Sequence, residues 1–78
     1  MVVTVKELDY KIKSEIINKI FYSTEDGKVS EDQLREMMSE GLHSACVTLI
    51  TEYYSVFGDV AVEISVDDLV TFYMSVEV

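Results

Sequence analysis

"VSEDQLREMM" (Val29–Met38) and "ISVDDLVTFY" (Ile64–Tyr73) stand 35 residues apart and follow one pattern. The first copy places Ser30 where a helix N-cap belongs and Gln33 three residues later, a capping box that predicts a helix. The two copies share Ser, Asp and Leu at matching places, in the pairs Ser30/Ser65, Asp32/Asp67 and Leu34/Leu69. Because a repeat of this period indicates one unit used twice, we expect a helix after Ser65 as well.

Capping signals and glycines predict two further helix boundaries. "TVKE" (residues 4–7) is another capping box, and apolar residues then recur every four positions from Leu8 to Ile20, which predicts an amphipathic helix. We expect Gly41 to end the helix that follows Ser30, since glycine favours the conformation that terminates a helix. A third helix is predicted at about 44–57, with Gly58 at its end.

The last segment has a rival interpretation. Apolar and polar residues alternate across residues 60–66 and again across 70–78, on either side of two aspartates. This alternation is the period of a β-strand, so the local pattern also allows a C-terminal β-hairpin. The repeat favours a helix over the hairpin.

The order helix, twelve-residue loop, helix, used twice, resembles a pair of EF-hands of the calmodulin and myosin light chain superfamily. With Gly27 at the sixth loop position, where the sharp EF-hand turn needs glycine, the first loop runs from Tyr22 to Gln33. Val29 and Ile64 then occupy the eighth position of their loops. The resemblance implies that these two residues pair in a short two-stranded β connection between the loops.

The implied fold class is all-α, a pair of EF-hands with four helices in one lobe. A chain of 78 residues has room for one domain, so we expect a single unit over residues 1–78. Hand 1 would occupy about 5–40 and hand 2 about 44–76.

Both loops lack carboxylates that Ca²⁺ binding requires. In the first loop, Tyr22 stands at position 1 and Gln33 at position 12, where a bidentate glutamate belongs. The second loop, residues 57–68, has Phe57 and Ala61 at ligand positions. We therefore expect no metal and no other cofactor. A calcium-sensor lobe whose first loop still binds weakly is the alternative.

The charge balance points to a basic partner. Fifteen acidic and six basic residues give a net charge of −9 and a sequence pI near 4.2. This disfavours direct binding of nucleic acid, whose phosphates need Lys and Arg, and favours cationic peptides. The chain has no run of ~18 apolar residues and no signal-peptide pattern. We expect a cytoplasmic protein without direct membrane contact.

Enzymatic activity has little support in the sequence. His43 is the only histidine and lies three residues from Cys46, the only cysteine. A paired thiol and imidazole could form an activated nucleophile, but no third orienting group is evident. We expect no catalytic residues.

In the calmodulin superfamily, an apolar groove between the helices grips an amphipathic target helix, and the resemblance implies such a groove here. Its candidate residues are apolar or aromatic and lie on the predicted helices: Ile17, Ile20, Phe21, Met37, Met38, Tyr53, Val56, Phe72, Tyr73 and Met74. Three acidic residues flank these helices as candidate contacts to a basic target: Glu36, Glu40 and Glu52.

These features together resemble the small light chains of unconventional (class I) myosins. The resemblance implies a calcium-independent light chain that binds and stiffens a basic IQ-motif helix in the neck of a myosin heavy chain. It would be a monomer in a heteromeric complex, associated with the cytoskeleton. The alternative of another class is an acidic inhibitor that mimics nucleic acid and blocks a DNA- or RNA-binding enzyme.

Overall fold

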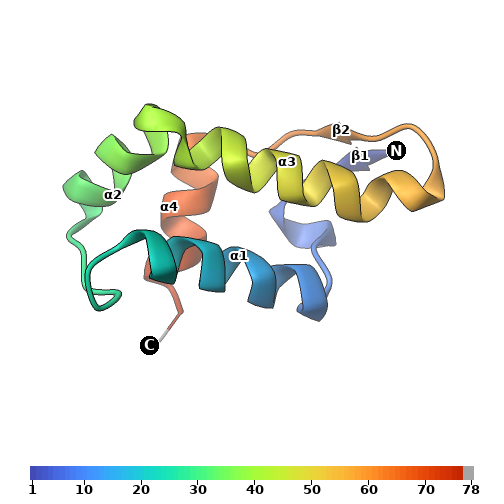
Figure 1. Ribbon diagram of the computed structural model, residues 1–78. Helices are drawn as coiled ribbons and strands as arrows, with labels where there is room; N and C mark the ends of the chain where they lie inside the picture. Colours follow the sequence, from blue (N-terminus) through green and yellow to red (C-terminus); the bar gives the residue numbers. More distant parts are fainter. Residues whose placement is uncertain (77–78) are drawn as a thin grey trace.

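The computed structural model describes residues 1–76 and consists mainly of helices, with one small sheet (Figure 1). In chain order the elements are β1 (Val2–Val3), the 3₁₀ helix η1 (Val5–Glu7), α1 (Tyr10–Ser23), α2 (Glu31–Met37), the π-helical turn η2 (Met38–Leu42), α3 (His43–Tyr54), the 3₁₀ helix η3 (Ser55–Phe57), β2 (Ala61–Val62) and α4 (Val66–Met74). The expected predominance of helices is confirmed. Because α2, η2 and α3 follow one another without a break, the longer helices form three continuous helical segments instead of the four separate helices expected.

The first long helix begins later than the sequence suggested. The capping box at Thr4 and Glu7 is present, with the Thr4 N–H donating to the Glu7 carboxylate at 2.9 Å, but it caps only η1. Leu8 is buried and extended, which interrupts the helix. Asp9 then caps α1 by accepting from the Ile12 N–H at 3.2 Å. The long helix therefore starts at Tyr10, because Leu8 is turned into the core.

Gly41 bends a helix instead of ending it, contrary to the prediction. Its φ of 129° lies outside the helical region, yet helix α2 continues through η2 into α3. A π-helical turn accommodates such an irregular residue without breaking the helix. Met38 and Leu42, on either side of Gly41, both remain buried, so the bend keeps the apolar stripe on the core. Gly58, in contrast, follows η3 with a φ of 123°, and the predicted helix end there is confirmed.

The C-terminal segment is helical, as the repeat indicated. Ser65 and Asp68 form the predicted capping box: the Asp68 N–H donates to the Ser65 hydroxyl at 3.1 Å, and the Asp68 carboxylate accepts from the Ser65 N–H at 2.9 Å. Helix α4 runs from Val66 to Met74, so the hairpin alternative is wrong for these residues. Residues 77–78 of the alternating pattern lie outside the described residues.

The sheet joins segments that the sequence did not pair. Strand β1 lies parallel to β2, with Val2 opposite Ala61 and Val3 opposite Val62. The expected β connection between Val29 and Ile64 is therefore wrong, since neither residue belongs to a strand. Hydrogen bonds from the Ala61 N–H to the Met1 carbonyl, and from the Glu63 N–H to the Val3 carbonyl, are both 2.8 Å long. These bonds occupy the N–H groups of Ala61 and Glu63 in the second loop, so neither group is available to pair with the first loop.

One apolar core connects all the helices. Helix α1 packs along α3, and α2 packs on α4. No charged side chain is buried among the described residues. The buried core consists of Val3, Leu8, Ile12, Ile16, Ile20, Leu34, Met38, Leu42, Cys46, Ile50, Tyr54, Ile64, Leu69, Val70 and Tyr73. Figure 1 shows the turn between α1 and α2 at one end of the molecule and the β1–β2 sheet at the other, along a longest dimension of 35 Å.

Candidate functional site

The predicted groove residues do not line a single groove. Ile20, Met38 and Tyr73 are buried in the core, which leaves them almost no surface for a partner. Their helical spacing is the same for a core position and for a groove position, and all three belong to the single buried core of the protein. Val56 and Met74 are well exposed, at 77% and 46%, but lie on different elements, η3 and the end of α4.

The remaining five predicted groove residues are half-buried and face different surroundings. Met37 lines a recess beside the turn between α1 and α2. Phe72 lines another recess, with Val5 of η1. The Tyr53 hydroxyl donates to the Asp9 carboxylate at 2.7 Å. The other two are Ile17 and Phe21.

Met37 opens onto a recess of about 340 Å³ that we call the acidic recess. Val29 and Met37 supply its apolar side chains, and three glutamates stand against one lysine around them. Its full lining is Ser23, Thr24, Glu25, Lys28, Val29, Gln33, Glu36, Met37 and Glu40. Two of the three predicted acidic contacts, Glu36 and Glu40, therefore lie together, while Glu52 on α3 does not join them. Glu25 was missed, since a loop residue carries no helical period to place it.

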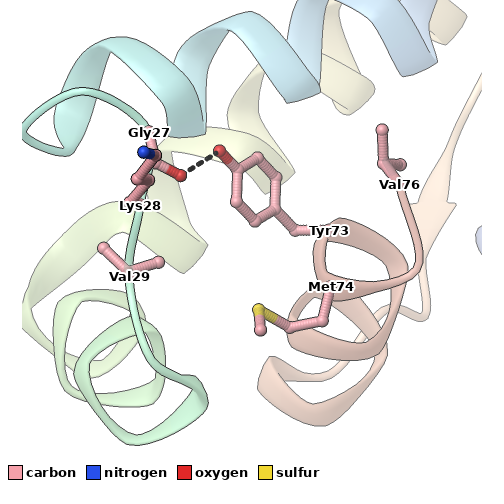
Figure 2. Close-up of a pocket in the computed structure, with 6 residues that line it drawn as sticks. All are labelled: Gly27, Lys28, Val29, Tyr73, Met74 and Val76. Carbon is pink, nitrogen blue, oxygen red and sulfur yellow. Dashed lines mark hydrogen bonds between the residues drawn. The ribbon is translucent and has the colours of Figure 1, made fainter. Parts of the chain in front are cut away.

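A second recess of about 430 Å³, the apolar recess, lies between the same turn and the end of α4. Figure 2 shows its six lining residues: Gly27, Lys28, Val29, Tyr73, Met74 and Val76. The Tyr73 hydroxyl donates to the Gly27 carbonyl at 3.2 Å, which ties α4 to the turn. Lys28 and Val29 line both recesses, so the two lie on either side of this short stretch of backbone.

The turn itself is fixed by its backbone and by one aromatic ring. Asp26 and Gly27 both have positive φ, 55° and 75°, in the left-handed region. The Asp26 carboxylate accepts from the Lys28 N–H at 3.2 Å, an Asx-type turn. The Phe21 ring packs so closely on Gly27 that a Cβ there would lie 2.4 Å from two ring carbons. Glycine is therefore required at this position for both conformation and space.

Two polar side chains at loop positions that the EF-hand resemblance assigned to ligands have internal partners. Gln33 Oε1 accepts from the Ser30 N–H at 3.0 Å, and the Thr24 hydroxyl donates to the Phe21 carbonyl at 2.9 Å. Within residues 1–76 no group of three or more His, Cys, Asp or Glu side chains is arranged to hold a metal ion. The turn thus presents the acidic recess as a charged surface rather than as a ligand cage.

An exposed ion pair connects the two copies of the repeat. Arg35 of α2 contacts the Asp67 carboxylate of α4 and, at 3.6 Å, the Glu31 carboxylate of its own helix. The pair joins helices that already pack on each other. At an exposed position, water and salt screen the two charges, so the pair contributes little to stability.

His43 and Cys46 do not form a reactive pair. The His43 Nε2 lies 2.7 Å from the Ile64 carbonyl oxygen, a bond that requires this nitrogen to carry a proton and donate. Burial raises the pKa of the Cys46 thiol to about 11, so the thiol is neutral at pH 7. The side chain is fully buried, and its surroundings are those of a core residue.

Asp9 carries the clearest electrostatic perturbation at the opposite end of the molecule. The hydrogen bond from the Tyr53 hydroxyl, together with the Ile12 N–H, holds the pKa of the Asp9 carboxyl below its usual value. The Tyr54 hydroxyl accepts from the Asp9 N–H at 2.9 Å and donates to the Glu7 carbonyl at 3.0 Å. These bonds fasten η1 and the start of α1 to α3, which is a structural role.

Comparisons with known proteins return no relative: the chain matches no protein-family model, no curated protein and no solved structure. The residues themselves therefore carry the functional argument. No helix in the described part of the chain combines the length and the apolar character needed to cross a lipid bilayer.

Proposed function

We propose that this chain is a non-enzymatic binding module that takes up a basic amphipathic helix without a metal ion. The observation that carries the proposal is the acidic recess, which is lined by the apolar side chains of Val29 and Met37 together with Glu25, Glu36 and Glu40. A Lys or Arg side chain has an apolar stem and a charged head, so it can cover the apolar side chains while its head reaches the carboxylates. The net charge of −9 would steer such a partner toward the surface.

The narrower form of the proposal is a calcium-independent myosin light chain. Its partner would be an IQ-motif helix in the neck of an unconventional myosin, which would associate the chain with the cytoskeleton. The glycine turn at Gly27 and the repeated caps at Ser30 and Ser65 support an EF-hand-like origin. The parallel β1–β2 pairing departs from the connection expected between two EF-hand loops, so the broader proposal has the stronger support.

A titration tests the broader proposal. A peptide of Leu, Gln, Lys and Arg with the apolar and basic faces of an IQ-type helix is titrated calorimetrically in calcium and in chelator. We expect the same affinity in both buffers, because within residues 1–76 no cluster of His, Cys, Asp or Glu side chains is arranged to hold the metal. A scrambled peptide of the same composition, with no amphipathic face, should bind more weakly.

A charge-matched pair of variants locates the site. The double variant Glu36→Gln, Glu40→Gln removes two carboxylates of the acidic recess, whereas Glu15→Gln, Glu63→Gln removes two exposed carboxylates elsewhere. Exposed ion pairs contribute about 0.2 to 1 kcal/mol each, so the first variant should raise the Kd about 2- to 30-fold. Equal effects of the two variants would show that only overall charge matters and would refute the assignment of the recess.

Salt dependence separates this proposal from the nucleic-acid mimic. A partner held on apolar side chains should retain most of its affinity as ionic strength rises. Binding that disappears in moderate salt, with no preference for the amphipathic peptide over the scrambled one, would favour the mimic.

A further inference from the structure

The acidic and apolar recesses share a wall. Lys28 and Val29 line both, with α2 on one side and the end of α4 on the other. In Figure 2 the Val29 side chain faces the gap between the turn and α4, with Tyr73 and Met74 across from it. A ligand that spans this wall would meet carboxylates on one side and apolar side chains on the other.

The apolar recess combines apolar side chains with one charged residue, Lys28. The Tyr73 hydroxyl donates to the Gly27 carbonyl at 3.2 Å, so its proton is already used within the protein. The apolar surface comes from the Tyr73 ring, Val76, Val29 and Met74, and the exposed fraction of Met74 is 46%. Methionine is unbranched and polarizable and adapts its shape to an apolar neighbour. The chemistry of this recess matches an aliphatic or aromatic side chain.

We propose that the apolar recess binds an apolar side chain of the same basic helix whose Lys or Arg occupies the acidic recess. This inference rests on the proposed function and deepens it: the partner is recognised by a cationic and an apolar residue on one helix face. Charge complementarity selects this occupant over a second copy of the chain. Docking of two identical surfaces would bring Glu25, Glu36 and Glu40 of each copy toward those of the other, and like charges disfavour that contact.

The spacing in the partner follows from helix geometry. Residues three and four apart lie on one face of a helix, whereas residues two apart point in different directions. A peptide with its lysine and leucine separated by three or four positions presents both on one face, and we expect it to occupy both recesses at once. A peptide of the same composition with a separation of two does not present both on one face, and it should bind about as weakly as one that lacks the leucine.

The four methionines of the chain provide a direct test. Met37 lines the acidic recess, Met74 lines the apolar recess, Met38 is buried in the core, and Met1 lies at the β1–β2 end. The protein is labelled with ¹³C-methyl methionine and titrated with the Lys–Leu peptide of four-residue spacing. We expect the Met37 and Met74 methyl signals to shift along one binding curve, while those of Met38 and Met1 stay in place.

The outcomes distinguish this inference from the proposal beneath it. A shift of Met37 without Met74 would leave the acidic recess as the binding site and overturn the second recess. No shift of either signal, with binding still measured by calorimetry, would overturn both. A shift of Met1 instead would place the binding site at the other end of the molecule and likewise overturn both.

A matched substitution completes the experiment. Met74→Ser removes an exposed apolar side chain of the recess, and Val56→Ser removes one that is 77% exposed on η3. We expect Met74→Ser to weaken the four-residue-spaced peptide about fivefold or more, from the lost apolar contact, and to leave the two-residue-spaced peptide unchanged. Val56→Ser should change neither. Equal weakening of both peptides by Met74→Ser would contradict the pairing of the two recesses.

Discussion

Replacing Gly27 by alanine should destabilise the protein through two separate effects at one atom. The new Cβ must occupy a left-handed position, with φ at 75°, which costs an L-residue about 1 to 2 kcal/mol. The same Cβ would stand 2.4 Å from Cδ2 and Cε2 of Phe21, and forcing a methyl group into a packed site costs about 1 to 3 kcal/mol more. The expected total is about 2 to 5 kcal/mol.

A loss of this size is a large fraction of the total stability and is readily measured. A 78-residue domain has a typical unfolding free energy of about 4 to 12 kcal/mol. Each kcal/mol moves the Tm of a domain this size by about 4 to 8 °C, so Gly27→Ala should melt at least about 8 °C below the parent. Urea unfolding followed by far-UV circular dichroism gives the free energy, and the slope with urea checks that unfolding stays two-state.

The double variant separates strain from clash. In a Phe21→Ala background the ring is absent, so Gly27→Ala should cost only the backbone term of about 1 to 2 kcal/mol. The difference between the two backgrounds is the contact of the ring with the glycine. If Gly27→Ala costs the same in both, the ring does not pack on Gly27. If it costs under about 0.5 kcal/mol in the parent, the turn does not hold the left-handed conformation either.

Three further outcomes follow from other parts of the fold. Ser65→Ala removes the N-cap of α4 and should cost about 1 kcal/mol, a fall in Tm of several degrees, whereas Ser75→Ala at the other end of α4 should cost less; equal melting points would contradict the cap. Cys46 should react with a thiol reagent such as DTNB far more slowly in the native protein than in urea, because the thiol is buried with its pKa raised to about 11; modification at the rate of a free thiol would show that α3 is not packed as described. The lowered pKa of Asp9 stabilises the folded state above the pKa of an unfolded aspartate, about 3.9, and that contribution is lost as pH falls through the lower folded pKa. Asp9→Asn should therefore be less stable than the parent at pH 6, and the gap in urea midpoint should shrink toward pH 3; a gap that does not change with pH would assign the effect to packing.

The helices could be predicted largely from local chemistry. Ser30 and Ser65 predict the starts of their helices correctly, because an N-cap hydroxyl accepts from a backbone N–H only two or three residues ahead. Such a local interaction can be read from the sequence. The repeat decided α4 correctly where alternation alone allowed a hairpin. The prediction that Gly41 ends its helix was wrong because glycine can either terminate a helix or bend it. Which of the two occurs depends on whether the residues after the glycine pack into the core. Leu42, the next residue, is buried in the core, so the helix continues.

The sheet and the recesses could not be predicted in the same way. Nothing in the composition of Val2 and Val3 distinguishes a strand that pairs with residues 61–62 from one that pairs elsewhere, because the pairing depends on where the helices bring each segment. Tyr73 has the helical spacing of a groove residue, but its hydroxyl bonds to the Gly27 carbonyl and holds α4 against the turn. Glu36 and Glu40, which the sequence singled out as candidates, line the same recess. The turn that sets Glu25 and Val29 beside them is visible only in three dimensions.

The parallel sheet has a consequence for the order in which the molecule assembles. It joins Met1 to Asp59, which are 58 residues apart, and closing a chain segment of that length costs about 4 kcal/mol in entropy. Two strands of two residues each recover little of that cost by themselves, so the sheet can form only once α1, the bent α2–α3 helix and α4 have brought its ends together. We therefore expect the β1–β2 end to close last during folding and to open first. The turn at Gly27 lies at the other end, so an opening of the sheet should expose the N-terminal segment to solvent and leave the two recesses intact.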